Sequence, residues 1–271
     1  MVQRWLWMIW TMLIVASTVA EDGPPLALTF TPVVIEAFVS EGCRHSPPVI
    51  EVLNHVAARA RSEDAPVYVL SYHVEYWNHL GWEDSFAREA HDQRQKAVAD
   101  ILRQPALRTP LVVINGNTLV SRSGLPQIMH LINNALGVEP VAGIAVTDLD
   151  HDQETVQVAM VMRGVTTDSR VHVALVERAL ASQVTGGDNK GQRLVHQGTV
   201  RDLVLVPAPE PTDDNDDPAL RMTTRLDFPQ DADPAHLQVV AFLQDPVSLR
   251  IFAAHGRDLT PPQAPEAESP P

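Results

Sequence analysis

The segment Cys43-Arg44-His45-Ser46 carries the side chains with the clearest chemical potential. Cys43 is the single cysteine of the 271-residue chain, so no disulfide can close within the chain. A helix predicted to open at Ser46 presents unpaired N–H groups and its positive dipole end to the thiol, and both favour the thiolate. Arg44 and His45 add a positive and an ionisable neighbour. We therefore predict monothiol chemistry, with Cys43, His45 and Ser46 as candidate catalytic residues.

Three functions of this segment stay open from the residues alone. As a reactive thiol, Cys43 would be reachable by solvent and would form mixed disulfides with a thiol/disulfide protein or glutathione. Because Ser46 has no sulfur to resolve them, turnover needs an outside thiol. As a packing residue, Cys43 would belong to a non-catalytic binding or structural module of the cell envelope. In the third interpretation, Cys43, His45 and His73 converge on Cu(I) or Zn(II). The sequence has no Cys-x-x-Cys or paired-His motif, so we predict no bound metal and no cofactor.

The elements that must position Cys43 alternate between strands and helices. Residues 33–39 form an apolar, β-branched run that predicts a buried strand, and residues 47–61 have apolar side chains at helical spacing, with Ser46 as N-cap. The same patterns predict further elements: a strand at 67–72, a helical region at 84–102, strands at 111–114 and 118–121 joined by a hairpin at Asn115-Gly116, and a helix at 125–136. This order is the thioredoxin topology.

From residue 141 onward the pattern changes to short strands separated by polar or Gly/Pro stretches. Runs of this kind with almost no helical pattern favour an antiparallel sandwich. The predicted fold class is therefore an α/β thioredoxin-like domain, residues 33–138, followed by an all-β sandwich domain, residues 139–258. The acidic run 213–217 is expected to be a solvated loop, and the Pro-rich tail 259–271 is expected to be disordered.

An aromatic, histidine-containing connection follows the second predicted strand. It contains His73, Tyr76 and Trp77 at the carboxyl end of that strand, where ligand sites of open α/β sheets are found. We take these residues, together with Arg44, as candidate substrate-binding residues. The alternative is an aromatic lid packed over the core, with the polar atoms of the tyrosine and tryptophan satisfied locally.

The amino terminus and the net charge bear on location and partners. Residues 1–20 show the order of a secretory signal peptide, with cleavage expected after Ala20 and a linker at 21–32; an uncleaved membrane anchor is the alternative. We expect the mature protein to be exported, either periplasmic or secreted. With 34 acidic and 20 basic side chains the formal net charge is −14, which argues against nucleic acid and membrane-surface partners.

Several separated motifs together resemble one protein family. They are Val34 to Cys43, Pro47-Pro48, His73-Val74-Glu75-Tyr76-Trp77, Leu80-Gly81-Trp82, Thr109-Pro110 and Gly187 to His196. From about Val33 to Phe252 the chain resembles the exported thioredoxin-like proteins of the domain of unknown function 1223 family. The family pattern is Cys-x-x-Cys-Pro-Pro, and this sequence departs from it at Ser46.

The resemblance also implies roles for Thr109 and Pro110 in substrate binding. It implies dithiol oxidoreductase activity for the family, which the serine at position 46 does not allow here. It further implies that Pro110 is a cis proline facing the cysteine loop and that the Thr109 backbone can pair with an extended peptide or glutathione. We predict a cis Thr109-Pro110 bond beside Cys43.

Overall fold

The computed structural model describes residues 31–121, 124–166, 168–209 and 219–259. The predicted signal peptide, most of the linker, the acidic run and the tail from residue 260 lie outside these ranges. Within the described ranges, no helix combines the length and the apolar character needed to cross a membrane.

Strands and helices alternate in the first half of the chain, and strands dominate the second. The elements are β1 (Val33–Val39), α1 (Ser46–Ser62), β2 (Val67–His73), the 3-10 helix η1 (Glu75–Leu80), α2 (Glu89–Ile101), β3 (Leu111–Ile114), β4 (Thr118–Leu119), α3 (Leu125–Leu136), β5 (Gly143–His151), β6 (Thr155–Arg163), β7 (Arg170–Glu177), β8 (Leu180–Gln183), β9 (Arg193–His196), β10 (Thr199–Pro207), β11 (Leu220–Asp227), the 3-10 helix η2 (Pro234–His236), β12 (Leu237–Gln244) and β13 (Ile251–Asp258).

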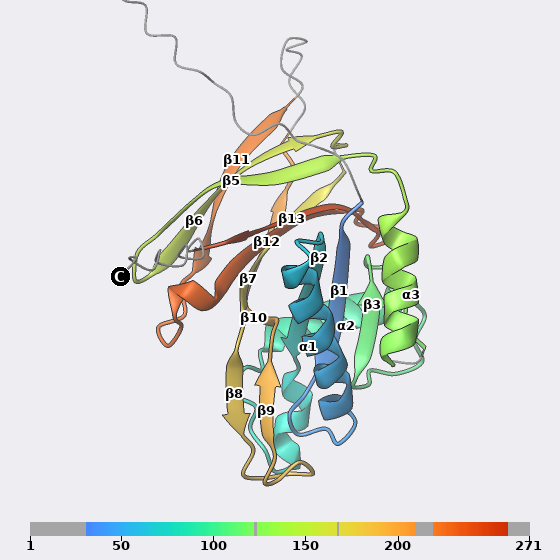
Figure 1. Cartoon of the computed structure of the whole chain (residues 1–271), viewed down its shortest axis with the longest axis vertical. Helices are drawn as coiled ribbons and strands as arrows, with labels where there is room; N and C mark the ends of the chain where they lie inside the picture. The colour runs from blue at the N-terminus through green and yellow to red at the C-terminus, as the bar shows by residue number, and fades with distance from the viewer. Residues whose placement is uncertain (1–30, 122–123, 167, 210–218, 260–271) are drawn as a thin grey trace, which may run out of the picture.

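One mixed sheet runs through both halves of the chain, in the order β13-β12-β7-β10-β2-β1-β3-β4 (Figure 1). The halves join where β10 lies parallel to β2, with Thr199 opposite Ser71. The Ser71 N–H donates to the Gly198 carbonyl at 2.6 Å. A Cβ on Gly198 would lie 2.5 Å from the Val69 carbonyl oxygen, so this close approach requires glycine.

The predicted fold class is therefore wrong. Instead of a thioredoxin-like α/β domain followed by a separate sandwich, strands of both halves share the eight-stranded sheet. The expectation failed because the β2–β10 pairing joins residues more than a hundred positions apart and leaves no periodic trace in the sequence. The loop between β3 and β4 also differs from the expected two-residue turn, because Ile114 pairs with Thr118 and leaves three residues between them.

The two faces of the large sheet are covered differently. On one face, α1 and α3 pack on β1, β2 and β3, while the three-stranded sheet β11-β6-β5 packs on β7 and β12. On the other face, α2 and η1 cover a core that extends from β1 and β2 across to β7 and β12. Because both faces are covered, every residue of β1 is buried, as its apolar run predicts. The two-stranded sheet β8-β9 projects from the rest of the molecule beside α1 (Figure 1).

Candidate functional site

Cys43 lies in the short connection between β1 and α1. Its N–H donates to the Ser40 carbonyl at 3.1 Å, and its own carbonyl accepts from the Ser46 N–H at 3.0 Å. The helix starts at Ser46 with His45 at the N-cap position, so the prediction of Ser46 as N-cap is wrong. The Ser46 hydroxyl instead accepts a hydrogen bond from the Ser40 N–H at 3.2 Å. Ser46 thus holds the cysteine loop closed on itself.

The Cys43 thiol faces the loop before β3. The Thr109-Pro110 peptide bond is cis, and the Cys43 Sγ donates to the Thr109 carbonyl at 3.5 Å. This confirms the predicted cis bond beside Cys43. The residue is 0% exposed, so the expectation of a solvent-reachable thiol is wrong.

The loop between β8 and β9 contributes to this burial. The Asn189 side-chain amide donates to the Glu41 carbonyl at 2.7 Å and to the Cys43 carbonyl at 3.0 Å. Beside it, Arg44 forms an exposed ion pair with Asp188 at 2.9 Å. Sequence analysis did not predict β8 or β9, although residues 187–196 belong to a motif of the resemblance. We call residues 184–192 the covering loop.

The covering loop also fits closely against the connection that follows η1. A Cβ on Gly186 would lie 2.1 Å from the Gly81 carbonyl oxygen, so only glycine allows this approach. At the next position, Gly187 has φ +63°, a left-handed conformation that favours glycine. The glycines of this motif therefore serve the fit of the loop over the first half of the chain.

Two buried carboxylate–imidazole pairs lie at the same end of the sheet. The His196 Nε2 lies 2.8 Å from the Glu41 Oε1, and the His73 Nδ1 lies 2.7 Å from the Asp84 Oδ2. The Trp82 indole N–H donates to the other Glu41 oxygen at 2.9 Å. Burial acts to raise the pKa of Asp84, but His73 and two backbone N–H groups lower it below its usual value. His73, a candidate substrate-binding residue, is therefore fully buried and held by Asp84.

Four side chains from η1, α2 and the loop before β3 have a buried polar atom with no hydrogen bond of close geometry. These atoms are Tyr76 Oη, Trp77 Nε1, Gln95 Oε1 and Thr109 Oγ1. Burial raises the pKa of Tyr76 to about 12, the nearby Gln95 and Trp77 side chains oppose this, and negative charge at Cys43 adds to it.

The sequence pointed to Tyr76 and Trp77 but missed Gln95. Gln95 lies on α2 and is 0% exposed. Its amide N–H donates to the Arg108 carbonyl at 2.7 Å. Arg108 precedes Thr109, whose carbonyl accepts the hydrogen bond from the Cys43 thiol. A glutamine on the buried face of a predicted helix was the available signal, because such a side chain needs polar partners.

The metal-binding interpretation finds no support in this geometry. Among the described residues, no group of three or more His, Cys, Asp or Glu side chains is placed to hold a metal ion. His45 is exposed, whereas Cys43 and His73 are buried. These three side chains therefore do not form a ligand set.

One protein-family model matches most of this chain. The family model described as "Protein of unknown function (DUF1223)" matches residues 34–244. The chain belongs to this family. The match includes the cysteine loop, the cis proline loop and the covering loop, so the family model spans every part of the site described above.

Among solved structures, this DUF1223 chain is similar to the crystal structure of protein AGR_C_4864 from Agrobacterium tumefaciens. The two are 24% identical with a TM-score of 0.61, and the match covers 89% of this chain and 99% of that one. It shows the fold alone. A β-glucosidase from Kluyveromyces marxianus also matches, at 11% identity over 49% of this chain and 16% of that one, but its TM-score of 0.24 carries no argument. No curated protein matches the chain significantly.

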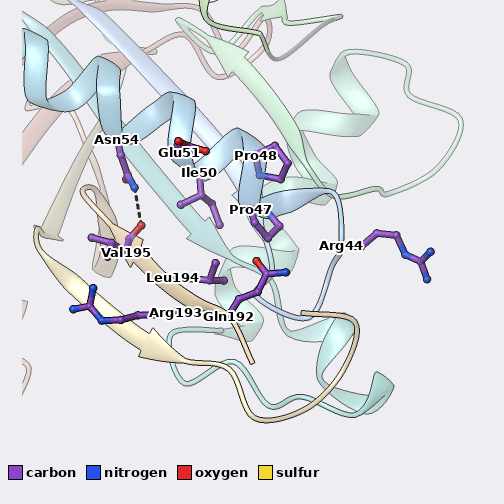
Figure 2. A pocket seen from close by; sticks show the side chains of 10 residues that line it. All are labelled: Arg44, Pro47, Pro48, Ile50, Glu51, Asn54, Gln192, Arg193, Leu194 and Val195. Carbon is purple, nitrogen blue, oxygen red and sulfur yellow. Dashed lines mark hydrogen bonds between the residues drawn. The ribbon is translucent and has the colours of Figure 1, made fainter. Parts of the chain in front are cut away.

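A groove of about 500 Å3 runs between α1 and β9 in this DUF1223 protein (Figure 2). Asn54 on α1 spans it, donating to the Val195 carbonyl at 2.7 Å and accepting from the Gln197 N–H at 3.0 Å. Arg44, a candidate substrate-binding residue, lines one end and extends outward (Figure 2). Cys43 is not among the lining residues, so the groove does not open onto the thiol.

Proposed function

We propose that this protein is an exported single-thiol protein in which Cys43 forms a mixed disulfide with a disulfide-containing partner after the covering loop has moved. The observation that carries the proposal is the hydrogen bond of a fully buried thiol to the backbone of the cis-proline loop. A cysteine that serves packing alone is surrounded by apolar atoms, whereas the Cys43 thiol donates to the Thr109 carbonyl at 3.5 Å.

The covering loop is held to the cysteine loop by few polar contacts. Asn189 supplies hydrogen bonds to the carbonyls of Glu41 and Cys43. The Arg44–Asp188 ion pair is exposed, and an exposed pair contributes about 0–1 kcal/mol. A local opening of this loop therefore costs less than unfolding of the chain.

The chemical step after opening is a thiol–disulfide exchange. The Cys43 thiol loses its proton, and the thiolate attacks one sulfur of the partner disulfide. The partner S–S bond breaks, its second sulfur leaves with the electron pair, and that thiolate takes up a proton. The Ser46 hydroxyl cannot attack the new disulfide, so an outside thiol such as glutathione must release the partner.

A second candidate is a non-catalytic binding or structural module, the other function that the sequence leaves open. It is favoured by the complete burial of Cys43 and by the engagement of the Ser46 hydroxyl with the Ser40 N–H. In that case Cys43 stays enclosed in the native state and reacts only when the protein unfolds.

The rate at which the folded full-length protein reacts with an aromatic disulfide distinguishes the two candidate functions. The reaction is measured as release of the coloured aromatic thiolate. Replacing Asn189 with alanine removes its two hydrogen bonds to the cysteine loop, at about 1 kcal/mol each, and is expected to speed the reaction by about 30-fold. The matched control is Gln183→Ala, which removes two hydrogen bonds within the hairpin, to Gly191 and Gln192, and leaves the cysteine loop untouched.

The control variant should react at nearly the wild-type rate. A rate that stays unchanged in Asn189→Ala and becomes measurable only in denaturant would exclude the exchange function and establish the non-catalytic one. A Cys43→Ser variant gives the background, because the chain has no other cysteine.

A further inference from the structure

The groove between α1 and β9 runs along one edge of the two-stranded sheet β8-β9. We propose that it binds an extended, acidic segment of a partner protein, which adds a third strand to this sheet along β9. The inference goes beyond the proposed function, because it does not require Cys43 to react. It uses the edge of β9, the side chains that line the groove and the charge that they carry.

The main-chain groups of β9 point alternately to its two sides. The Gln192 carbonyl accepts from the Val184 N–H at 2.9 Å and therefore points toward β8. Because the direction reverses at each residue of a strand, the N–H and C=O groups of Arg193 and Val195 point toward α1. The Val195 carbonyl agrees with this orientation, since it accepts from Asn54 on α1 at 2.7 Å.

Asn54 already occupies part of this edge in the way a neighbouring strand would. Its side-chain amide donates to the Val195 carbonyl at 2.7 Å and accepts from the Gln197 N–H at 3.0 Å (Figure 2). One residue of an adjacent parallel strand would form the same two hydrogen bonds.

The next pair of groups along the edge is the Arg193 carbonyl and the Val195 N–H. Among the described residues, no third strand pairs with β8-β9. An edge of this kind binds extended peptides by main-chain hydrogen bonds, and both residues line the groove. A segment lying in the groove can therefore donate to the Arg193 carbonyl and accept from the Val195 N–H.

The lining side chains favour a segment that alternates apolar and acidic residues. Ile50 of α1 and Leu194 of β9 are 4% and 7% exposed, and they form the floor of the groove. Arg44 and Arg193 are exposed at its rim. Because successive side chains of a strand point to opposite faces, such a segment places its apolar residues on the floor and its carboxylates at the rim.

The charge of the groove is opposite to that of the chain as a whole. Its lining contains two arginines and one carboxylate, Glu51, whereas the chain has a formal net charge of −14. Arg44 already pairs with Asp188. No carboxylate of the described residues pairs with Arg193, so its guanidinium is available to a carboxylate of the bound segment.

The test is binding of a fluorescein-labelled peptide of about eight residues, alternating glutamate and valine, to the full-length protein, measured by fluorescence anisotropy. The same peptide with lysine in place of glutamate is expected to bind about tenfold more weakly, because its charge is repelled by the arginines. A version with every main-chain nitrogen methylated keeps the side chains but has no N–H to donate to β9. It is also expected to bind about tenfold more weakly.

Two substitutions locate the peptide. Arg193→Glu reverses one charge at the rim and is expected to weaken binding of the glutamate peptide by about fivefold. The matched control is Arg225→Glu, which reverses the charge of an exposed arginine on β11 and should change the affinity by less than about twofold. Glu51→Gln removes the carboxylate from the groove and is expected to strengthen binding by about threefold, a direction that a misfolded variant does not produce.

The outcomes separate this inference from the proposed function. Absence of binding, or equal affinities for the three peptides, would overturn strand addition and would leave the exchange reaction standing, because the peptides contain no cysteine. Binding as expected in a protein whose thiol never reacts would support the inference and exclude only the exchange. Dimerisation of the protein that the glutamate peptide disrupts would assign the groove to a second copy of this chain and overturn the assignment to a partner protein.

Discussion

Replacing Arg94 with methionine is expected to lower the free energy of unfolding by about 3–5 kcal/mol. Arg94 on α2 pairs with Glu36 at the centre of β1, with 2.5 Å between Nε and Oε1. Glu36 is 0% exposed. Without the guanidinium, its carboxylate stays in the core with no cation to offset the loss of hydration, and this penalty dominates the cost of the substitution.

The position of Arg94 adds to this effect. Its guanidinium carbon lies 5.5 Å from the centroids of both the Tyr72 and Phe242 rings, which belong to β2 and β12. One cation thus contacts strands from both halves of the large sheet. Burial opposes the charged form, but the attraction of Glu36 outweighs it and raises the pKa of Arg94.

Urea denaturation of two further variants tests whether the unpaired Glu36 carboxylate causes this loss of stability. The double variant Glu36→Leu with Arg94→Met removes both charges and is expected to cost much less than Arg94→Met alone, because no unpaired ion remains. The control is Arg59→Met, which breaks an exposed pair with Glu63 and is expected to cost less than about 1 kcal/mol. If Arg94→Met also cost less than about 1 kcal/mol, the buried ion pair would not be a main source of stability.

The sequence pattern correctly predicted elements whose formation depends mainly on their own residues. The helix expected at 125–136 is found with those bounds, because apolar side chains at helical spacing lie between Gly124 and Gly137. The strand β1 is also found at the expected residues. Glu36 interrupts its apolar run, and this was the available signal for a buried ion pair.

Long-range contacts explain what the sequence could not predict. The strands β8 and β9 are short and partly polar, and they form because they pair with each other and because Asn54 on α1 engages Val195. Burial of Cys43 depends partly on Asn189, which lies 146 residues further along the chain. The Cys43–Thr109 contact was expected from the resemblance, whereas no local sequence pattern predicted the covering loop.

Acidification from about pH 7 to pH 4 is expected to reduce the free energy of unfolding by about 6 kcal/mol through two buried imidazoles. Burial lowers the pKa of His91 from 6.5 to about 4. Burial and the positive charge of Arg94 lower the pKa of His172 from 6.5 to about 2. The Nδ1 of His172 lies 3.5 Å from the Arg94 guanidinium, which can only donate, so the imidazole must stay neutral to accept.

The direction of the effect follows from proton binding in the two states. Above pH 6.5 both imidazoles are neutral whether the chain is folded or not, so neither affects stability. As the pH falls below 6.5, these two imidazoles bind protons in the unfolded chain but not in the folded chain, and stability is lost. The loss from His91 is complete near pH 4, the folded value, at about 3 kcal/mol, and that from His172 continues below it.

Urea denaturation of His172→Gln, His91→Gln and wild type at several pH values between about 7 and 4 measures these contributions. Glutamine keeps a hydrogen-bonding side chain but takes up no proton in this range, so each variant should lose less stability on acidification than wild type, by about 3 kcal/mol at pH 4. His55→Gln, which removes an exposed imidazole from α1, is the matched control. Parallel stability–pH curves for wild type and both buried-site variants would mean that these imidazoles do not make the fold acid-sensitive.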